Sequence, residues 1–212
     1  MFKDCISLKT IVIPESVIHI GTNALKATKI TTIHIPANVE SIGDGAFLNC
    51  SSMTNITFAE GIKPLTIGTL ENANKTNGVF YGTKVAVFNV PDRAIYIGAY
   101  AFYNQTALTT VLMGESSQVT QIGKYAFYGT SKLANLTLGQ KVESILQYAF
   151  YKTAMTSITI PKSVTMIAQR AFSNTTKTKT IIFEQGGTAD LVFDGDYIFA
   201  SNTSMTEITL PA

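Results

Sequence analysis

The sequence predicts a solenoid of about nine coils, with a single parallel β-sheet and short turns or 3₁₀ segments on the opposite side. Three observations predict this fold. A large apolar residue returns nine times, and five of the eight gaps are 22 or 23 residues. An isoleucine stands five positions before it in six copies, and alternating apolar residues follow it. The recurring series is Phe2, Leu25, Phe47, Phe80, Phe102, Phe127, Phe150, Phe172 and Phe199.

The alternating block of each copy, such as Ile33 and Ile35, predicts a short strand with one buried face. A proline often follows, as at Pro36 and Pro161. It ends the pairing because proline has no backbone N–H to donate to a ladder. The residues between the apolar ones should face solvent. They are Thr57, Asn89, Thr137, Thr159 and Thr209, interrupted by Val12, His34, Leu112 and Ile182.

The segment after the proline predicts the return of the chain along another face, through apolar pairs such as Val39 and Ile42. Glycine then permits a tight corner. The Ala-Phe step that follows is too short for a full helix, so it predicts one helical or 3₁₀ turn with phenylalanine inside. One unit buries too little apolar surface to fold alone, whereas stacked units form a continuous core.

The complete motif reads I-G-x-x-A-F-x-x-C/T-x-x-L-x-x-I-x-I-P-x-S-V and covers essentially the whole chain. An L-x-x-L-x-L block in a period of about 20–29 residues is typical of leucine-rich repeats. The longer motif resembles the BspA-like subfamily of bacterial and protist cell-surface leucine-rich repeats. The resemblance implies a secreted or surface-attached interaction protein. It departs from commoner leucine-rich repeats at the asparagine position, held here by Ser16, Asn38, Lys141 and Ser163, so no continuous asparagine ladder is expected.

We expect one leucine-rich repeat domain, residues 1–212, with two insertions. The first, Thr69–Gly78, is polar and should form a surface loop. The second is Glu184–Asp196. Met1 and Ala212 both fall inside a repeat, and neither end has an atypical capping unit. The chain therefore reads as a fragment of a longer array.

The composition favours an extracellular or cell-surface protein, because Ser, Thr and Asn carry the polar surface and only 14% of residues are charged. The net charge is +2, and the basic residues are scattered along the sequence, which gives no electrostatic support for a nucleic acid or an anionic membrane. No apolar run approaches the ~20 residues that span a bilayer. The N-terminal stretch is no signal peptide, so signal and anchor are absent from this fragment.

The two cysteines, Cys5 and Cys50, occupy the same register two repeats apart. Stacked strands are about 4.8 Å apart, which separates the two cysteines by roughly 10 Å. A disulfide requires Cα atoms within about 7 Å. We therefore expect two free, buried thiols.

The sequence predicts no catalytic residue, metal site or cofactor. His19 and His34 have no partner at a metal-binding spacing. Asp190, Asp194 and Asp196 surround a glycine, but their spacing differs from that of a calcium-binding EF-hand loop. A solvated loop explains these three carboxylates better.

Tyrosine is the most informative surface residue, because eight of the nine fall into two registers. Tyr100, Tyr125, Tyr148 and Tyr197 precede the aromatic position by two, and Tyr81, Tyr103, Tyr128 and Tyr151 follow it by one. Stacking should turn each register into a ladder. The ladders either stabilise the stack through ring packing or form a binding strip, since tyrosine is favoured in recognition surfaces. Tyr103, Tyr128 and Tyr151 are the expected ligand contacts.

These observations leave three functions open. The first is a non-enzymatic adhesion or interaction module that binds a host, matrix or cell-surface protein. The second is a structural spacer that displays another domain. The third is a carbohydrate-binding module that uses the tyrosine ladders, with a glycan as partner. An enzyme is a distant fourth, because almost every residue already has a role in the repeat.

Overall fold

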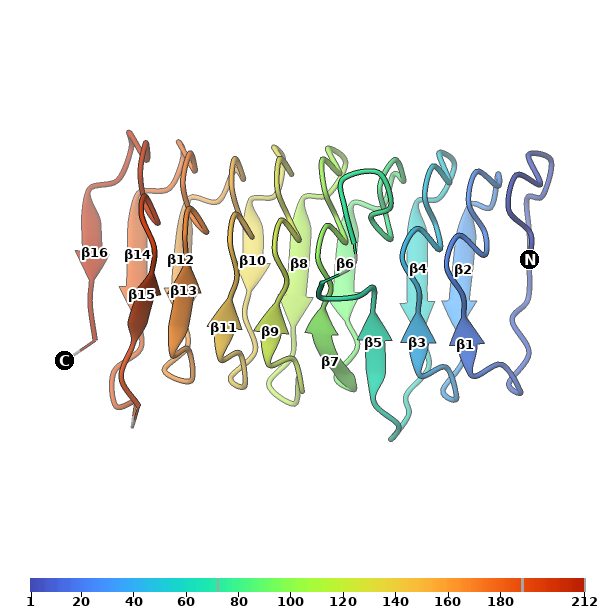
Figure 1. The fold of residues 1–212 in the computed structure, drawn as a ribbon, viewed down its shortest axis with the longest axis horizontal. Helices are drawn as coiled ribbons and strands as arrows, with labels where there is room; N and C mark the ends of the chain where they lie inside the picture. The colour runs from blue at the N-terminus through green and yellow to red at the C-terminus, as the bar shows by residue number, and fades with distance from the viewer. Residues whose placement is uncertain (72, 188, 212) are drawn as a thin grey trace.

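The computed structural model describes residues 1–71, 73–187 and 189–211, so Asn72, Thr188 and Ala212 lie outside it. The chain forms an elongated parallel β-solenoid, and each coil contains two short strands joined by two turns (Figure 1). No helix occurs among the described residues. The predicted solenoid is therefore confirmed.

One continuous sheet runs along the solenoid and is formed by the odd-numbered strands, all parallel to one another. These strands come from the return segments, and their buried isoleucines pair coil to coil, as Ile42 does with Ile20 and Ile67. The strands are β1 (His19–Ile20), β3 (Ser41–Ile42), β5 (Leu65–Ile67), β7 (Ala94–Ile97), β9 (Gln121–Ile122), β11 (Ser144–Ile145), β13 (Met166–Ala168) and β15 (Val192–Asp194).

The even-numbered strands form a second row, and they are the strands that the alternating apolar blocks predicted. They are β2 (Thr32–Ile35), β4 (Asn55–Phe58), β6 (Val87–Val90), β8 (Thr110–Met113), β10 (Asn135–Thr137), β12 (Ser157–Ile160), β14 (Thr180–Phe183) and β16 (Glu207–Thr209). This row is divided into three shorter sheets, β2–β4, β6–β8–β10 and β12–β14–β16. The expected single sheet thus becomes two rows, because the return segments stack at the same spacing and pair as well.

Two edges complete the solenoid. The upper edge consists of the turns that run from an odd-numbered strand to the next even-numbered strand, and the lower edge of the turns that run back (Figure 1). In the upper turns, backbone amides alternate between the turn and the next coil. The amide of Tyr103 donates to the carbonyl of Tyr100 at 3.0 Å, and that of Phe102 donates to Ala126 at 2.7 Å.

The upper turns are not the helical or 3₁₀ segments that the Ala-Phe step predicted. Residues two before and two after the aromatic have left-handed backbone angles, for example φ of 57° at Tyr100 and 51° at Asn104. A right-handed helix cannot continue through such residues. The chain therefore turns sharply and hydrogen-bonds to the neighbouring coil.

A spine of stacked phenylalanines fills the core behind the upper turns. Phe47, Phe80, Phe102, Phe127, Phe150 and Phe172 are almost fully buried, and Phe199 continues the series. Successive ring centroids lie 4.6 to 5.8 Å apart with nearly parallel planes. The repeated aromatic position is thus the axis of the hydrophobic core.

The two insertions differ in structure. In the first insertion, Asn72 lies outside the described residues, and residues 69–71 and 73–78 belong to the upper edge. There the carboxylate of Asp44 accepts hydrogen bonds from the amide and hydroxyl of Thr69 at 2.9 and 2.8 Å. Within Glu184–Asp196, the expected solvated loop is wrong for Asp194, which ends strand β15. Backbone pairing with β13 makes this strand although all its side chains are exposed.

Both cysteines are free, as expected, but only one is buried. Cys50 replaces the threonine of other coils. Its thiol donates a hydrogen bond to the carbonyl of Leu25 at 3.0 Å and shares a second hydrogen bond with the hydroxyl of Thr28 at 3.3 Å. Cys5 lies in the first coil and is exposed, so the expectation of a buried thiol is wrong for this residue.

This difference predicts two thiol populations. In the native protein, a thiol reagent should modify Cys5 at once and Cys50 slowly, since burial hides the Cys50 thiol and raises its pKa. Unfolded protein without reductant should titrate with two thiols per chain. A count of zero in a monomer, or equal native rates for the two cysteines, would contradict this assignment.

Candidate interaction surface

The tyrosines of the upper edge form two stacked rows. In the first row, the ring centroids of Tyr100, Tyr125 and Tyr148 are 4.8 Å apart, with planes within 12° of parallel. In the second row, Tyr103, Tyr128 and Tyr151 follow at 5.0 and 4.9 Å, and Tyr81 adds a looser step of 6.5 Å. The predicted ladders are present.

The two rows also contact each other within each coil. Ring centroids are 5.4 Å apart for Tyr100 and Tyr103, 5.6 Å for Tyr125 and Tyr128, and 5.5 Å for Tyr148 and Tyr151. We call these six tyrosines the tyrosine ladder.

Arg170 extends the first row. Its guanidinium lies 5.8 Å from the ring of Tyr148 and 4.9 Å from that of Tyr197. A guanidinium over an aromatic face is a favourable contact. The row therefore continues to Tyr197 although one coil has no tyrosine in this register.

The first row carries backbone strain. Tyr100, Tyr125 and Tyr148 have φ of 57° or 58°, where other coils place Asn23 or Gly45. A bulky side chain in the left-handed region costs about 1–2 kcal/mol relative to a relaxed backbone. Glycine would fit without that cost, so ring stacking must offset the strain.

This strain predicts an unusual order of stability at Tyr125. Tyr125→Gly should have a free energy of unfolding about 1 kcal/mol higher than Tyr125→Ala, because both variants lose the ring and only glycine relieves the strain. Urea denaturation of both variants measures the difference. At Tyr128, whose φ is not positive, alanine should be at least as stable as glycine. The same order at both positions would contradict the strain account.

The ladder offers ring edges and hydroxyls to a partner, because the ring faces cover one another. All six rings are partly exposed, neither buried nor free. Burial raises the pKa of Tyr100, and burial with neighbouring tyrosines raises the pKa of Tyr103 and Tyr125. Their hydroxyls remain protonated at neutral pH and can donate hydrogen bonds.

The fold gathers charges that are scattered in the sequence. The turns of the upper edge contain ten basic residues against three acidic ones, Asp44, Glu71 and Asp196. The ten are Lys26, Lys29, Lys75, Lys84, Lys124, Lys132, Lys152, Arg170, Lys177 and Lys179.

The turns of the lower edge have the opposite excess, with seven acidic and four basic residues. They are Glu40, Glu60, Asp92, Glu115, Glu143, Glu184 and Asp190, against Lys63, Arg93, Lys141 and Lys162. The basic residues are scattered along the sequence, but in the structure ten of them lie in the upper turns, so the expectation of dispersed basic charge is wrong for the folded protein.

The other side chains considered as sites form no binding site in the described residues. The Nδ1 atoms of His19 and His34 lie 2.9 Å from the hydroxyls of Ser41 and Thr57, respectively. Asp190, Asp194 and Asp196 are all exposed, and no group of three His, Cys, Asp or Glu side chains suited to a metal occurs in the part of the chain that the structure describes.

The outward row of the even-numbered strands points to solvent as predicted. His34, Thr57 and Asn89 are exposed, and Leu112 and Ile182 expose 41% and 42% of their surface. This row is the rival of the tyrosine ladder as a binding surface. Its apolar members are separated by Thr and Asn, so it offers no contiguous anchor.

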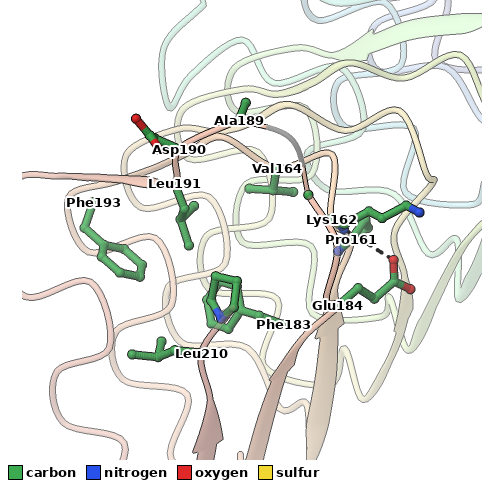
Figure 2. Close-up of a pocket in the computed structure, with 12 residues that line it drawn as sticks. Pro161, Lys162, Val164, Phe183, Glu184, Ala189, Asp190, Leu191, Phe193 and Leu210 are labelled. Carbon is green, nitrogen blue, oxygen red and sulfur yellow. Dashed lines mark hydrogen bonds between the residues drawn. The ribbon is translucent and has the colours of Figure 1, made fainter.

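A hollow of about 380 Å³ lies near β14 and β15, between Phe183, Leu191, Phe193 and Leu210 (Figure 2). At its rim, the carboxylate of Glu184 accepts a hydrogen bond from the backbone amide of Lys162 at 3.3 Å. Its apolar lining has the register of core residues in other coils. The hollow is therefore an uncovered end of the core rather than a separate site.

Arg93 is a buried charged residue, a kind of residue often found at functional sites, and no pattern in the sequence indicated its burial. It is 6% exposed, yet it lies in a lower turn and donates to the carbonyls of Val39 at 2.6 Å, Pro36 at 3.1 Å and Lys63 at 3.3 Å. Burial lowers its pKa from the usual value for arginine. The guanidinium joins three successive lower turns where β4 and β6 do not pair. We assign it a structural role.

Comparison with known proteins agrees with this architecture. A family described as the BspA type leucine-rich repeat region matches in six copies, over residues 1–77, 74–190 and 120–212. A search of curated proteins finds no significant match. Among the residues described, no helix has the length and apolar character needed to cross a membrane.

A solved structure similar to this chain is that of a leucine-rich cell-surface protein of Faecalibacterium prausnitzii. It is 26% identical with a TM-score of 0.58, over 98% of this chain and 55% of its own. The pneumococcal vaccine antigen PcpA is 16% identical with a TM-score of 0.49, over 90% of this chain and 59% of its own. The chain thus spans less than two thirds of either protein.

Proposed function

Because the chain belongs to the BspA type leucine-rich repeat family, we propose that it is a non-enzymatic module that binds another protein outside the cell or at its surface. Repeat proteins of this class present long regular faces on which a partner can lie. The cell-surface description of the Faecalibacterium prausnitzii protein supports this location. Adhesion to a host, matrix or neighbouring cell is the role that fits such a module.

The observation that carries this proposal is the tyrosine ladder. Interface hot spots are enriched in Tyr and Arg, and the ladder combines six partly exposed tyrosines with the stacked guanidinium of Arg170. The rings are held in place by their neighbours, so little side-chain entropy is lost on binding.

The ladder gives less support to a carbohydrate partner. Sugar rings bind aromatic side chains through the ring face, whereas the faces of Tyr103, Tyr128 and Tyr151 are within 15° of parallel and about 5 Å apart. Only edges and hydroxyls remain for contact. Hydrogen bonding and charge are therefore the interactions available, and a protein supplies both.

The test is a comparison of two surfaces on one partner. The protein is used as bait on extracellular material, the captured protein is purified, and its Kd is measured against two triple variants. Tyr103→Ser, Tyr128→Ser and Tyr151→Ser together should abolish binding, while circular dichroism stays that of the wild type. His34→Ser, Leu112→Ser and Ile182→Ser together should leave the Kd within about twofold. The reverse pattern would move the binding surface to the strands.

A further inference from the structure

Four successive upper turns combine the tyrosine ladder with a single sign of charge. Residues 98–109, 123–134, 146–156 and 169–179 contain six basic residues and no acidic one. Lys124, Lys132 and Lys152 are exposed, and the amine of Lys152 lies 5.5 Å from the ring of Tyr151. Lys152 therefore adjoins the tyrosine ladder, and Lys124 and Lys132 are exposed in the same turns.

The chemistry of this surface favours anions. An aromatic ring is electropositive at its edge, and stacking leaves the edges exposed. Neutral tyrosine hydroxyls donate hydrogen bonds, and the lysines add positive charge that no carboxylate within these turns offsets. Edges, hydroxyls and ammonium groups all interact favourably with a carboxylate.

We propose that the tyrosine ladder binds an acidic segment of a protein partner, whose Asp and Glu carboxylates pair with Lys124, Lys132 and Lys152 and accept hydrogen bonds from the tyrosines. This inference rests on the proposed function and names the class of partner. Nucleic-acid bases, like sugars, bind by stacking on ring faces, which are covered here. Flexible Asp and Glu side chains can contact the exposed edges of the tyrosine rings and do not need an open ring face.

The lower edge of a second copy fits this surface less well. It mixes seven acidic residues with four basic ones, and Glu40 already pairs with Lys63 at 2.8 Å. The carboxylate of Glu184 is likewise bonded to Gln140 at 3.1 Å. Binding of a second copy through these acidic groups would have to break the contacts that Glu40 and Glu184 make within their own chain.

The probe is a fluorescein-labelled peptide of ten glutamates in a Gly-Ser background, followed by fluorescence anisotropy. A peptide of the same length with glutamine in place of glutamate is the neutral control. The glutamate peptide should bind, the glutamine peptide should not, and rising salt should weaken binding because exposed charges are screened. Equal binding of both peptides would overturn the charge argument.

A matched pair of variants locates the binding. Lys124→Glu with Lys152→Glu should weaken binding of the glutamate peptide at least about tenfold. Lys141→Glu with Lys162→Glu makes the same change in net charge on the lower edge and should alter the affinity less than about twofold. Equal losses in both variants would show a general charge effect and reject the surface. Sedimentation of the wild-type protein alone should show a monomer at physiological salt, and salt-sensitive oligomers would identify a second copy as the occupant instead.

The outcome separates this inference from the proposed function. If the tyrosine triple variant loses the captured partner while Lys124→Glu with Lys152→Glu binds it as the wild type does, the interaction surface stands and the acidic partner is rejected. If both variants keep the partner, both proposals fail. Single-stranded DNA or a sulfated polysaccharide that binds through the same lysines, with no binding of the glutamate peptide, would also reject the acidic protein.

Discussion

Phe127→Ala should lower the free energy of unfolding by about 3–5 kcal/mol, because a fully buried ring is lost and a cavity remains. Phe127 has no exposed surface and stacks on Phe102 at 5.1 Å and on Phe150 at 5.3 Å. In a solenoid each coil contacts only its neighbours, so a defect here weakens two interfaces at once. Urea denaturation followed by circular dichroism measures the loss.

Tyr128→Ala is the matched control, since Tyr128 is adjacent in sequence and stacks with similar geometry at 5.0 and 4.9 Å. Its ring is partly exposed, so its removal should cost clearly less than removal of Phe127. Comparable losses would mean that interior and exterior are wrongly assigned.

Arg93→Ala should destabilise the protein by about 2–4 kcal/mol, because charge-assisted hydrogen bonds are lost and buried carbonyls lose their donor. The guanidinium joins the carbonyls of Pro36, Val39 and Lys63 across three lower turns. This is where the second strand row breaks between β4 and β6, so the guanidinium supplies hydrogen bonds between coils beside a gap in that row. Unfolding of residues 1–90 ahead of the rest would be the expected signature in hydrogen exchange.

Two further variants test the geometry at this position. Arg93→Lys keeps the positive charge, but a lysine ammonium lacks the planar fork of donors that reaches all three carbonyls. Its free energy of unfolding should therefore lie between those of the wild type and Arg93→Ala. Arg170→Ala removes the other arginine, which is partly exposed and contacts rings instead of carbonyls, and should cost less. A stability of Arg93→Ala equal to that of Arg170→Ala would reject the structural role.

The solenoid and its core could be predicted because the repeat places equivalent residues in equivalent environments. Phe127 and the outward His34 follow directly from their register in the sequence. The tyrosine registers predicted ladders for the same reason. Periodicity carries this information because each side chain meets a copy of itself in the next coil.

Other features depend on contacts that periodicity does not show. The return segments form the longest sheet although strands such as Ser41–Ile42 are too short to have a recognisable pattern. The partners of Arg93 are up to 57 residues away and are backbone carbonyls, which no sequence motif marks. The basic upper edge arises from lysines at several registers, such as Lys124 and Lys132, which only the turns bring to one side.

Hydroxyl-radical footprinting of the wild-type protein, free and bound to its captured partner, tests the central claim most directly. It reports side-chain accessibility at each position without a mutation. We expect oxidation of Tyr103, Tyr128 and Tyr151 to fall on binding, while His34 and Leu112 on the strand row stay unchanged. Protection of His34 and Leu112 with unchanged tyrosines would contradict the assignment of the upper edge as the interaction surface.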